Sequence, residues 1–314
     1  MSQNFKILIG FDGFVDSIYH PVEERKNVND VLFFPSIQSF AQRLQKASNV
    51  SCNIELVLQE KRIGGNAPIM AKALLDMGAI INFIGTLGDP QIEPVFTEFA
   101  SRCSHVTSLS SSGKSDVLEF QDGKIMLGHH DSILGLNQTI LQEKMGPLLK
   151  ILWAESDLVA MVNWTMFPNM NAIWRYLQTA YPPTDKLFFF DLADPSKRSL
   201  ADLKEALQLI AGFNRSILSL NESEAAQIKA LVGSDFPYNL GISELVIHSK
   251  TSALVYAEGS SFEVESELIQ NPVRVTGVGD NFNAGYCLAR LEKKGYIDSL
   301  LAGCLAARIY LTKT

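Results

Sequence analysis

The chain has 314 residues, of which 46% are hydrophobic and 19% charged, and its formal net charge is −7. This composition can build a large buried core, which excludes disordered, collagen-like and small disulfide-scaffold proteins. An acidic chain without clusters of Lys and Arg is not expected to bind nucleic acid. The sequence has no 18-residue apolar segment and no signal-peptide pattern, so we expect a cytoplasmic protein that does not enter a membrane.

Short apolar segments alternate with helix-like segments through most of the chain. The apolar segments have the length and composition of strands buried in a parallel sheet. In chain order, the predicted strands are 5–11, 80–84, 158–162, 187–190, 217–220 and 245–247, and the predicted helices are 67–77, 169–180, 200–210, 222–232 and 281–294. This alternation predicts an α/β fold whose mostly parallel central sheet is covered by helices on both faces. No repeat or low-complexity linker divides the chain, so we expect one domain over residues 1–314.

Two regions, residues 13–35 and about 105–130, are richer in polar and turn residues. In the second region, Asp122-Gly123 lies between two strand-like segments, which is a strong β-hairpin signal. Antiparallel strands inserted in a parallel α/β body often form a lid or a dimer surface. A lid would exclude water from a reaction beneath it.

A glycine-rich segment near the C-terminus, Gly277-Val278-Gly279-Asp280, leads into a predicted helix. Glycines let backbone N–H groups converge, and a helix N-terminus adds partial positive charge, so the segment predicts an anion cradle. Asp280 beside this cradle could accept a proton from a hydroxyl group that attacks a bound phosphoryl group. A glycine turn followed by an Asp N-cap is the purely structural alternative.

The segment 274–286 resembles the C-terminal signature of the ribokinase-like (PfkB) carbohydrate kinase family, and the match covers Gly277, Gly279, Asp280 and Phe282. Other segments resemble further family motifs in the family order. These are the opening strand with its carboxylate in 10–16, the N-terminal signature in 62–68 and 84–89, the central stretch in 191–198, and the Asn-x-x-Glu motif in 221–224. The resemblance covers nearly the whole chain and implies a ribokinase-like three-layer sandwich with a small β lid.

The resemblance implies ATP-dependent phosphorylation of a hydroxyl group on a sugar or sugar-like small molecule. Asp280 would be the general base, and the N–H groups of Gly277, Val278 and Gly279 would stabilise the transferred phosphoryl group. Asn221 and Glu224 would organise Mg²⁺ and phosphate through water. An N-cap and a first-turn acid in a helix would explain these two residues without any metal.

The substrates would lie on either side of the cradle. The acceptor would contact the carboxylates and backbone of the N-terminal motifs, which are Asp12, Asp16, Gly64, Gly65 and Asn66. The nucleotide would contact Asn221, Glu224, His248, Lys250, Gly277 and Gly279. Taken alone, Asp12 and Asp16 could also cap a loop, and Gly64-Gly65 could be only a turn.

The sequence departs from the family pattern at three places. Arg274 replaces the family's Asp near a monovalent-cation site, so we expect its guanidinium to replace the cation and the enzyme not to need potassium. Ile69 replaces a sugar-binding Asn, which means either that Asn66 compensates or that the substrate differs from ribose-like sugars. The nucleotide loop reads His248-Ser249-Lys250 without its usual Gly, which leaves nucleotide preference open.

Two other functions compete with a sugar kinase. A nucleoside kinase of the same fold would need an aromatic-lined lid, which Phe14, Tyr19, Phe33 and Phe34 could supply. A non-catalytic sugar- or nucleotide-binding paralogue is the second alternative, although such a binder needs no base beside an anion cradle. In this family the lid strands often pair across a homodimer, so a homodimer through the lid is one of the oligomeric states that the sequence leaves open.

Overall fold

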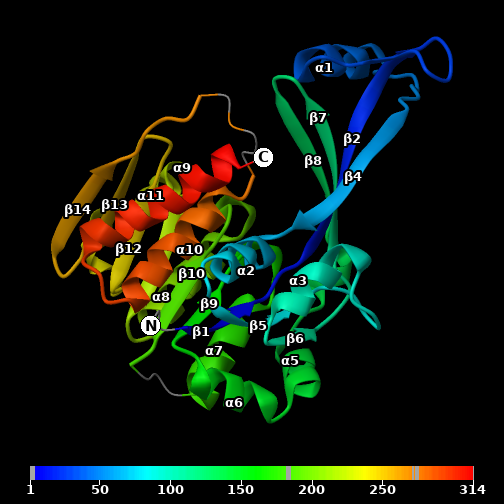
Figure 1. Cartoon of the computed structure of the whole chain (residues 1–314). Helices are drawn as coiled ribbons and strands as arrows, with labels where there is room; N and C mark the ends of the chain where they lie inside the picture. Colours follow the sequence, from blue (N-terminus) through cyan, green and yellow to red (C-terminus); the bar gives the residue numbers. More distant parts are fainter. Residues whose placement is uncertain (1–3, 182–184, 271, 273–275, 314) are drawn as a thin grey trace.

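The structure is a computed structural model that describes residues 4–181, 185–270, 272 and 276–313 (Figure 1). Its centre is a nine-stranded sheet in the order β14-β13-β12-β11-β10-β9-β1-β5-β6. The strands from β12 to β6 are parallel, while β13 and β14 are antiparallel additions at one edge. The strands are β1 Lys6–Gly10, β5 Ile80–Gly85, β6 His105–Ser108, β9 Leu158–Met161, β10 Leu187–Asp191, β11 Ser216–Asn221, β12 Glu244–His248, β13 Ser252–Ala257 and β14 Ser260–Glu265.

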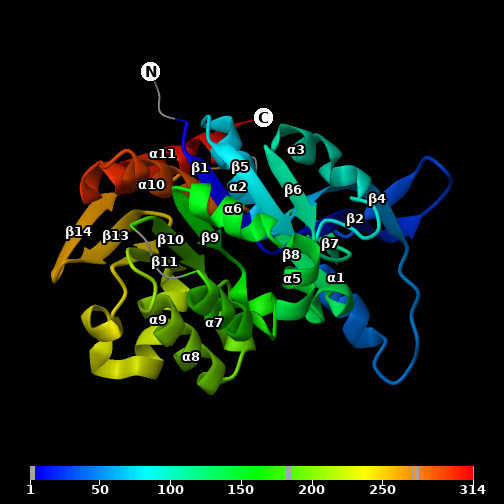
Figure 2. The ribbon, with the colours of Figure 1, turned by 90° about the horizontal axis from the view of Figure 1, so that it is seen from below.

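Helices cover both faces of this sheet (Figure 2). One face carries α5 Gln138–Met145, α6 Leu148–Glu155, α7 Met170–Ala180, α8 Leu200–Ala211 and α9 Glu222–Val232. The other face carries α2 Asn66–Asp76, α3 Thr97–Arg102, α10 Val278–Leu291 and α11 Tyr296–Thr312. Strand β10 explains the two layers, because Phe188 and Phe190 enter the first core and Phe189 enters the second. The predicted three-layer α/β sandwich is confirmed.

A second, smaller sheet stands out from the body (Figure 1). Its strands are β2 Phe14–Arg25, β3 Val31–Phe33, β4 Leu56–Gly64, β7 Gly113–Phe120 and β8 Gly123–His129, and β2 pairs with β3, β4 and β7. The predicted hairpin at Asp122-Gly123 joins β7 to β8. Two details differ from the expected lid boundaries, because β6 belongs to the large sheet and β4 adds a strand between the two expected regions.

The tip of the small sheet is closed by α1 Ile37–Lys46. Phe34 and Phe40 pack there against Leu118 and Phe120, which gives the lid its own apolar cluster. A short helix, α4 Asp131–Leu134, follows the small sheet, and 3₁₀ turns occur at Pro94–Phe96, Trp164–Met166, Pro195–Lys197, Gly233–Asp235 and Tyr238–Leu240. Among the described residues, no helix is long and apolar enough to cross a membrane.

Candidate active site

The predicted site residues gather at the carboxyl ends of the parallel strands, where open α/β sheets generally bind their ligands. Asp12 follows β1, Asp191 ends β10, and Asn221 ends β11. Helix α10 begins at the same place, and its first turn contains Asp280. The carboxyl groups lie near enough that Asp191, Asp12 and Glu224 all raise the pKa of Asp280 by charge repulsion.

The N-terminus of α10 requires glycine at its cap. Gly277 has a φ of +89°, in the left-handed region that L side chains rarely adopt. A Cβ atom there would lie 2.9 Å from Cγ2 of Ile69, which occupies the position of the family's sugar-binding Asn. The first N–H groups of a helix have no partner within it, so this terminus can accept an anion. Arg274 and Val275, which precede the cap, lie outside the described residues.

Asp280 is buried in the first turn of α10 and is 8% exposed. Burial is the main cause that raises its pKa well above the usual range, and the neighbouring carboxyl groups add to it. A carboxyl group in such a place readily accepts a proton, as a general base must. Positive charge brought by Mg²⁺ would favour its ionised form.

Asp12 holds the start of α2 rather than facing free space. Its Oδ2 accepts hydrogen bonds from the N–H of Asn66 at 2.8 Å and from Nδ2 of Asn163 at 2.6 Å, and its Oδ1 accepts one from the N–H of Ala67 at 2.7 Å. Burial raises the pKa of Asp12 to about 6. A Cβ on Gly65, whose φ is +94°, would lie 2.7 Å from the same carboxylate, so glycine permits this close approach.

Asp16 lies where the lid joins the body. It sits on β2 between Arg62 of β4 and Ser115 of β7, and the Ser115 hydroxyl bonds its carboxylate. Burial raises the pKa of Asp16, while the charges of Arg62 and Lys124 lower it. A Cβ on Gly64 would lie 2.4 Å from Oδ1 of Asp16, so the backbone also approaches this carboxylate closely.

A lid residue that the sequence did not single out reaches the anion cradle. Lys124 of β8 donates a hydrogen bond from Nζ to Oγ1 of Thr276, the residue before Gly277. The carbonyl of Thr276 in turn accepts a hydrogen bond from the hydroxyl of Tyr310 on α11 at 2.8 Å. The small sheet therefore reaches the start of α10 and places a cation beside the cradle.

Asp191 and Asn283 form a second group that was not assigned a role from the sequence. Asp191 accepts hydrogen bonds from Nδ2 of Asn283 at 3.2 Å, from Nδ2 of Asn66 at 3.5 Å and from the N–H of Ala193 at 2.7 Å. Burial raises its pKa to about 6. Asn66 therefore connects the acceptor-side helix α2 to this carboxylate. The sequence feature that could have identified Asn283 is its spacing of three residues from Asp280, which places the two side chains on the same side of a helix.

Asn221 and Glu224 form the capping box that was the structural alternative for this motif. Asn221 Oδ1 accepts from the N–H of Glu224 at 3.0 Å, and Glu224 Oε2 accepts from the N–H of Asn221 at 2.9 Å. Burial, followed by repulsion from Asp191, raises the pKa of Glu224 to about 8. Within the described parts of the chain, no three His, Cys, Asp or Glu side chains are placed to ligate a metal. Asn221 and Glu224 offer amide and carboxylate oxygens, the ligand type that Mg²⁺ takes, and Asp191 lies near enough to Glu224 to add negative charge.

The two remaining nucleotide-side residues differ in position. His248 ends β12 and packs on the ring of Phe282, with 5.0 Å between ring centroids. Burial lowers its pKa to about 4, and a Cβ on Gly279 would lie 3.2 Å from its Cε1, so a neutral imidazole backs the cradle. Lys250 is exposed in the turn after β12.

The lid aromatics proposed for a purine site are used within the lid. Phe34 packs edge-on against Phe40, with centroids 5.4 Å apart, and Phe33 packs against His20. Phe14 is buried against His130. These contacts do not favour the nucleoside-kinase alternative.

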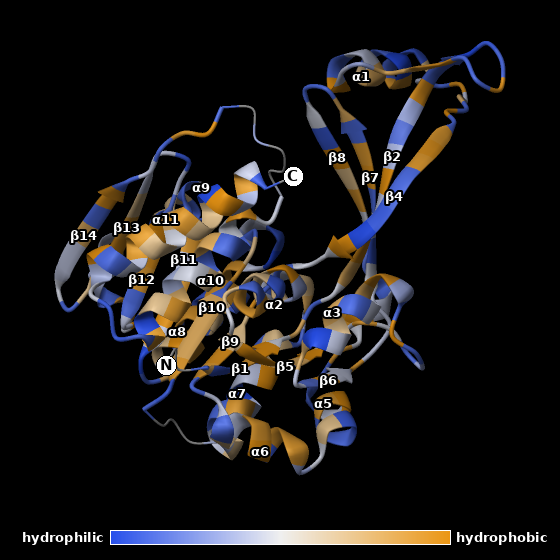
Figure 3. Ribbon diagram, in the orientation of Figure 1, coloured by the Kyte–Doolittle hydropathy of each residue, from blue (hydrophilic) through white to orange (hydrophobic). Residues whose placement is uncertain are grey.

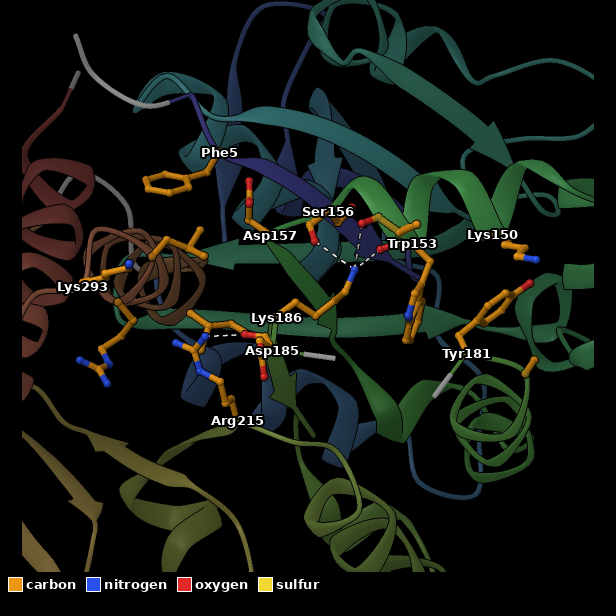
Figure 4. A pocket seen from close by; sticks show the side chains of 15 residues that line it. Phe5, Lys150, Trp153, Ser156, Asp157, Tyr181, Asp185, Lys186, Arg215 and Lys293 are labelled. Carbon is orange, nitrogen blue, oxygen red and sulfur yellow. Dashed lines mark hydrogen bonds between the residues drawn. The ribbon is translucent and has the colours of Figure 1, made fainter. Parts of the chain in front are cut away.

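A cavity of about 660 Å³ lies away from this site, against the opposite ends of β1 and β10 (Figure 4). Among its cations, Lys186 donates to the carbonyl oxygens of Trp153 and Ser156, and Arg215 donates to that of Asp185. None of the predicted site residues lines this cavity.

Comparison with known proteins identifies the family. The family model for prokaryotic ketohexokinase matches residues 2–313. A ketohexokinase from Haloferax volcanii is 28% identical over 95% of this chain and 84% of its own length. Among solved structures, a ribokinase from Thermotoga maritima (TM-score 0.66, 15% identity, 99% of this chain and 94% of that chain) shares the fold. So does a nucleoside kinase from Methanocaldococcus jannaschii (TM-score 0.67, 14% identity, 98% and 92%). The chain belongs to the prokaryotic ketohexokinase family and is a carbohydrate kinase with the ribokinase fold.

Proposed function

We propose that this protein transfers the γ-phosphoryl group of ATP to a hydroxyl group of a ketohexose. The family and the Haloferax ketohexokinase support the sugar class. One observation carries the mechanism: Asp280 is a buried carboxyl group in the first turn of α10, directly after the glycine cap that can hold the phosphoryl group.

In this mechanism, Asp280 takes the proton of the sugar hydroxyl as its oxygen bonds to the γ-phosphorus. The bond from that phosphorus to the β,γ-bridging oxygen breaks, and ADP leaves with the electron pair. The transition state is loose, so the protein acts mainly by positioning and by balancing charge. The N–H groups of Gly277, Val278 and Gly279 face the charge on the transferred group, and general-base catalysis supplies about 10²- to 10⁴-fold.

On the acceptor side, we assign hydroxyl contacts to Asp16, Asn66 and the backbone of Gly64 and Gly65. Asp12 acts through α2, since its carboxylate already accepts hydrogen bonds from the first turn of that helix. Lys124 closes the lid over the sugar through its contact with Thr276. Closure of this kind excludes water, which would otherwise compete with the sugar as acceptor.

On the nucleotide side, His248, Lys250 and Gly279 border the ATP site. Asn221 and Glu224 would hold Mg²⁺ through water, and the ion would supply positive charge that offsets the charge of the nucleotide phosphates. A cation beside Glu224 would favour its carboxylate form.

The lid also has a second proposed role as a homodimer contact. Its strands β4 and β8 are sheet edges, and they expose Leu56, Leu58 and Met126 to between 40% and 50% of their surface. Exposed edge strands pair readily with a second chain. We propose that the lids of two copies meet there, which is tested by whether Leu58→Glu lowers the sedimentation coefficient.

The function is tested by ADP release from Mg-ATP with a pool of ketohexoses, aldohexoses, pentoses and nucleosides. The proposal predicts release with the ketohexoses, and splitting that pool identifies the substrate. Release with nucleosides alone would establish a nucleoside kinase instead. No release, combined with a sugar or ATP that still raises the melting temperature, would establish the binding paralogue.

A further inference from the structure

The outer face of α11 carries a row of large apolar side chains exposed to solvent. Ile297, Leu301, Leu305 and Ile309 are 41%, 48%, 57% and 54% exposed. Their spacing of four residues places them along one face of the helix, while Leu300, Gly303 and Ala306 on the opposite face are buried. Figure 3 shows the hydrophobic colouring recurring along α11, which packs against α10.

A continuous row of this kind is unusual on the surface of a monomer. Isolated exposed leucines are common, whereas contiguous apolar patches mark surfaces that bind something. The helix has 17 residues and is about 25 Å long, so the row spans a distance suited to another helix.

The apolar side chains on this face follow the same order, Ile-Leu-Leu-Ile, from either end of the helix. Ile297 and Ile309 lie six residues on either side of Gly303, and Leu301 and Leu305 lie two residues on either side. In an antiparallel pair of α11 helices related by a two-fold axis that crosses the exposed face level with Gly303, Leu301 of one copy would meet Leu305 of the other. The outer isoleucines would come level with each other in the same way. Such self-complementarity is what a two-fold symmetric interface requires.

Two charged side chains on this face are also placed symmetrically about the level of Gly303, an acidic one on one side and a basic one on the other. Asp298 and Arg308 are both exposed, five residues before and after Gly303. The antiparallel pair brings Asp298 of one copy level with Arg308 of the other, and a parallel pair would instead bring like charges together. Within its own chain Arg308 contacts Glu267 at 2.8 Å, and both side chains are more than half exposed. A guanidinium has five N–H donors, so it can accept a second carboxylate partner.

We propose that the occupant of this surface is a second copy of the chain, bound antiparallel through α11. A standard stable interface covers about 800 Å² on each partner, which is more than one helix face supplies. The α11 dimer is therefore a reversible one that forms as the protein concentration rises. It is independent of pairing through the lid, because α11 and the small sheet lie on different parts of the molecule (Figure 1).

Sedimentation velocity over a wide range of protein concentrations tests this interface. In the Leu58→Glu background, which removes the proposed lid contact, we expect the chain to dimerise with rising concentration and to stay monomeric when Leu301→Glu/Leu305→Glu is added. Leu200→Glu is the matched control, since Leu200 is 58% exposed on α8 and lies outside the row. Circular dichroism checks that all variants are folded. A Leu58→Glu chain that is monomeric at every concentration overturns the proposal, as does a dimer of that chain that survives the addition of Leu301→Glu/Leu305→Glu.

Two further variants test the antiparallel register. Asp298→Arg and Arg308→Glu should each weaken the dimer, and the two combined should restore it, because every intermolecular charge pair is then reversed. In oxidising conditions, a mixture of Leu301→Cys and Leu305→Cys chains of different tagged lengths should form mainly mixed disulfide dimers. Failure of the charge reversal to restore the dimer, or cross-linking of Leu301→Cys chains mainly to themselves, would overturn the antiparallel arrangement.

Discussion

Replacing the cap glycine of α10 separates its structural role from its role in catalysis. Gly277→Ala introduces a side chain at a φ of +89°, which costs about 1–2 kcal/mol of stability. The new Cβ would also lie 2.9 Å from Cγ2 of Ile69, whereas carbon atoms prefer about 3.5 Å or more. Relieving this overlap adds a cost of about 1–3 kcal/mol, or moves the cap by several tenths of an ångström.

Movement of the cap should affect catalysis more than stability. A shift of about 1 Å in an active site can cost about 10²-fold, so we expect kcat to fall by at least about tenfold. Gly78→Ala is the matched control, because Gly78 has a φ of +91° and no atom within 4 Å of an added Cβ. It should lose similar backbone stability without losing activity.

The assay is steady-state ADP release, with thermal unfolding measured for each variant. Gly277→Ala/Ile69→Ala should recover part of the lost kcat, because the second change removes the contacting methyl group. If Gly277→Ala keeps its full kcat while losing stability, the N–H groups at this cap do not contact the reacting phosphoryl group.

The remaining predictions concern pH, the lid and the monovalent cation. The pKa of Glu224 is raised from 4.5 to about 8 in the folded protein, so the native state holds one more proton than the unfolded state between these pH values. Glu224 therefore makes the free energy of unfolding fall as pH rises through this window, and Glu224→Gln should flatten the fall. In melting scans at pH 8, Mg-ATP should stabilise the wild type more than Glu224→Gln, and equal stabilisation would argue against a magnesium role. Lys124→Ala should raise the KM for sugar and lower kcat by about tenfold, with Lys124→Arg close to the wild type, since arginine keeps both the positive charge and an N–H donor for Thr276. Replacing potassium with a large organic cation should leave the rate unchanged if Arg274 takes the cation's place, and strong activation by potassium would contradict this.

The body of the fold could be predicted from the sequence because its signals are local. Strand β10 is the apolar run 187–190, and α9 begins and ends at the predicted residues 222 and 232. Strand β4 was missed because residues 59–62, Gln-Glu-Lys-Arg, give it a polar, exposed character. β4 is stabilised by its pairing with β2, and a pairing between distant segments leaves no pattern in the local sequence.

The site was predictable only where its chemistry lies within one segment. The cradle and Asp280 follow one another in sequence, so the motif showed them together. The contacts from Lys124 to Thr276 and from Asn66 to Asp191 join residues more than 120 positions apart. For the same reason the sequence could not show that the Asp12 carboxylate accepts hydrogen bonds from the first N–H groups of α2, since these contacts depend on the tertiary fold.

The central claim is that Asp280 takes the proton of the sugar hydroxyl, and Asp280→Asn tests it most directly. Asparagine keeps nearly the same shape and cannot act as a base, so sugar-dependent ADP release should fall by at least about 10²-fold. Sugar and Mg-ATP should still raise the melting temperature of the variant, because the cradle and the acceptor contacts remain. A variant that binds both ligands and releases ADP at the wild-type rate would contradict the account, because the proton would then be accepted elsewhere.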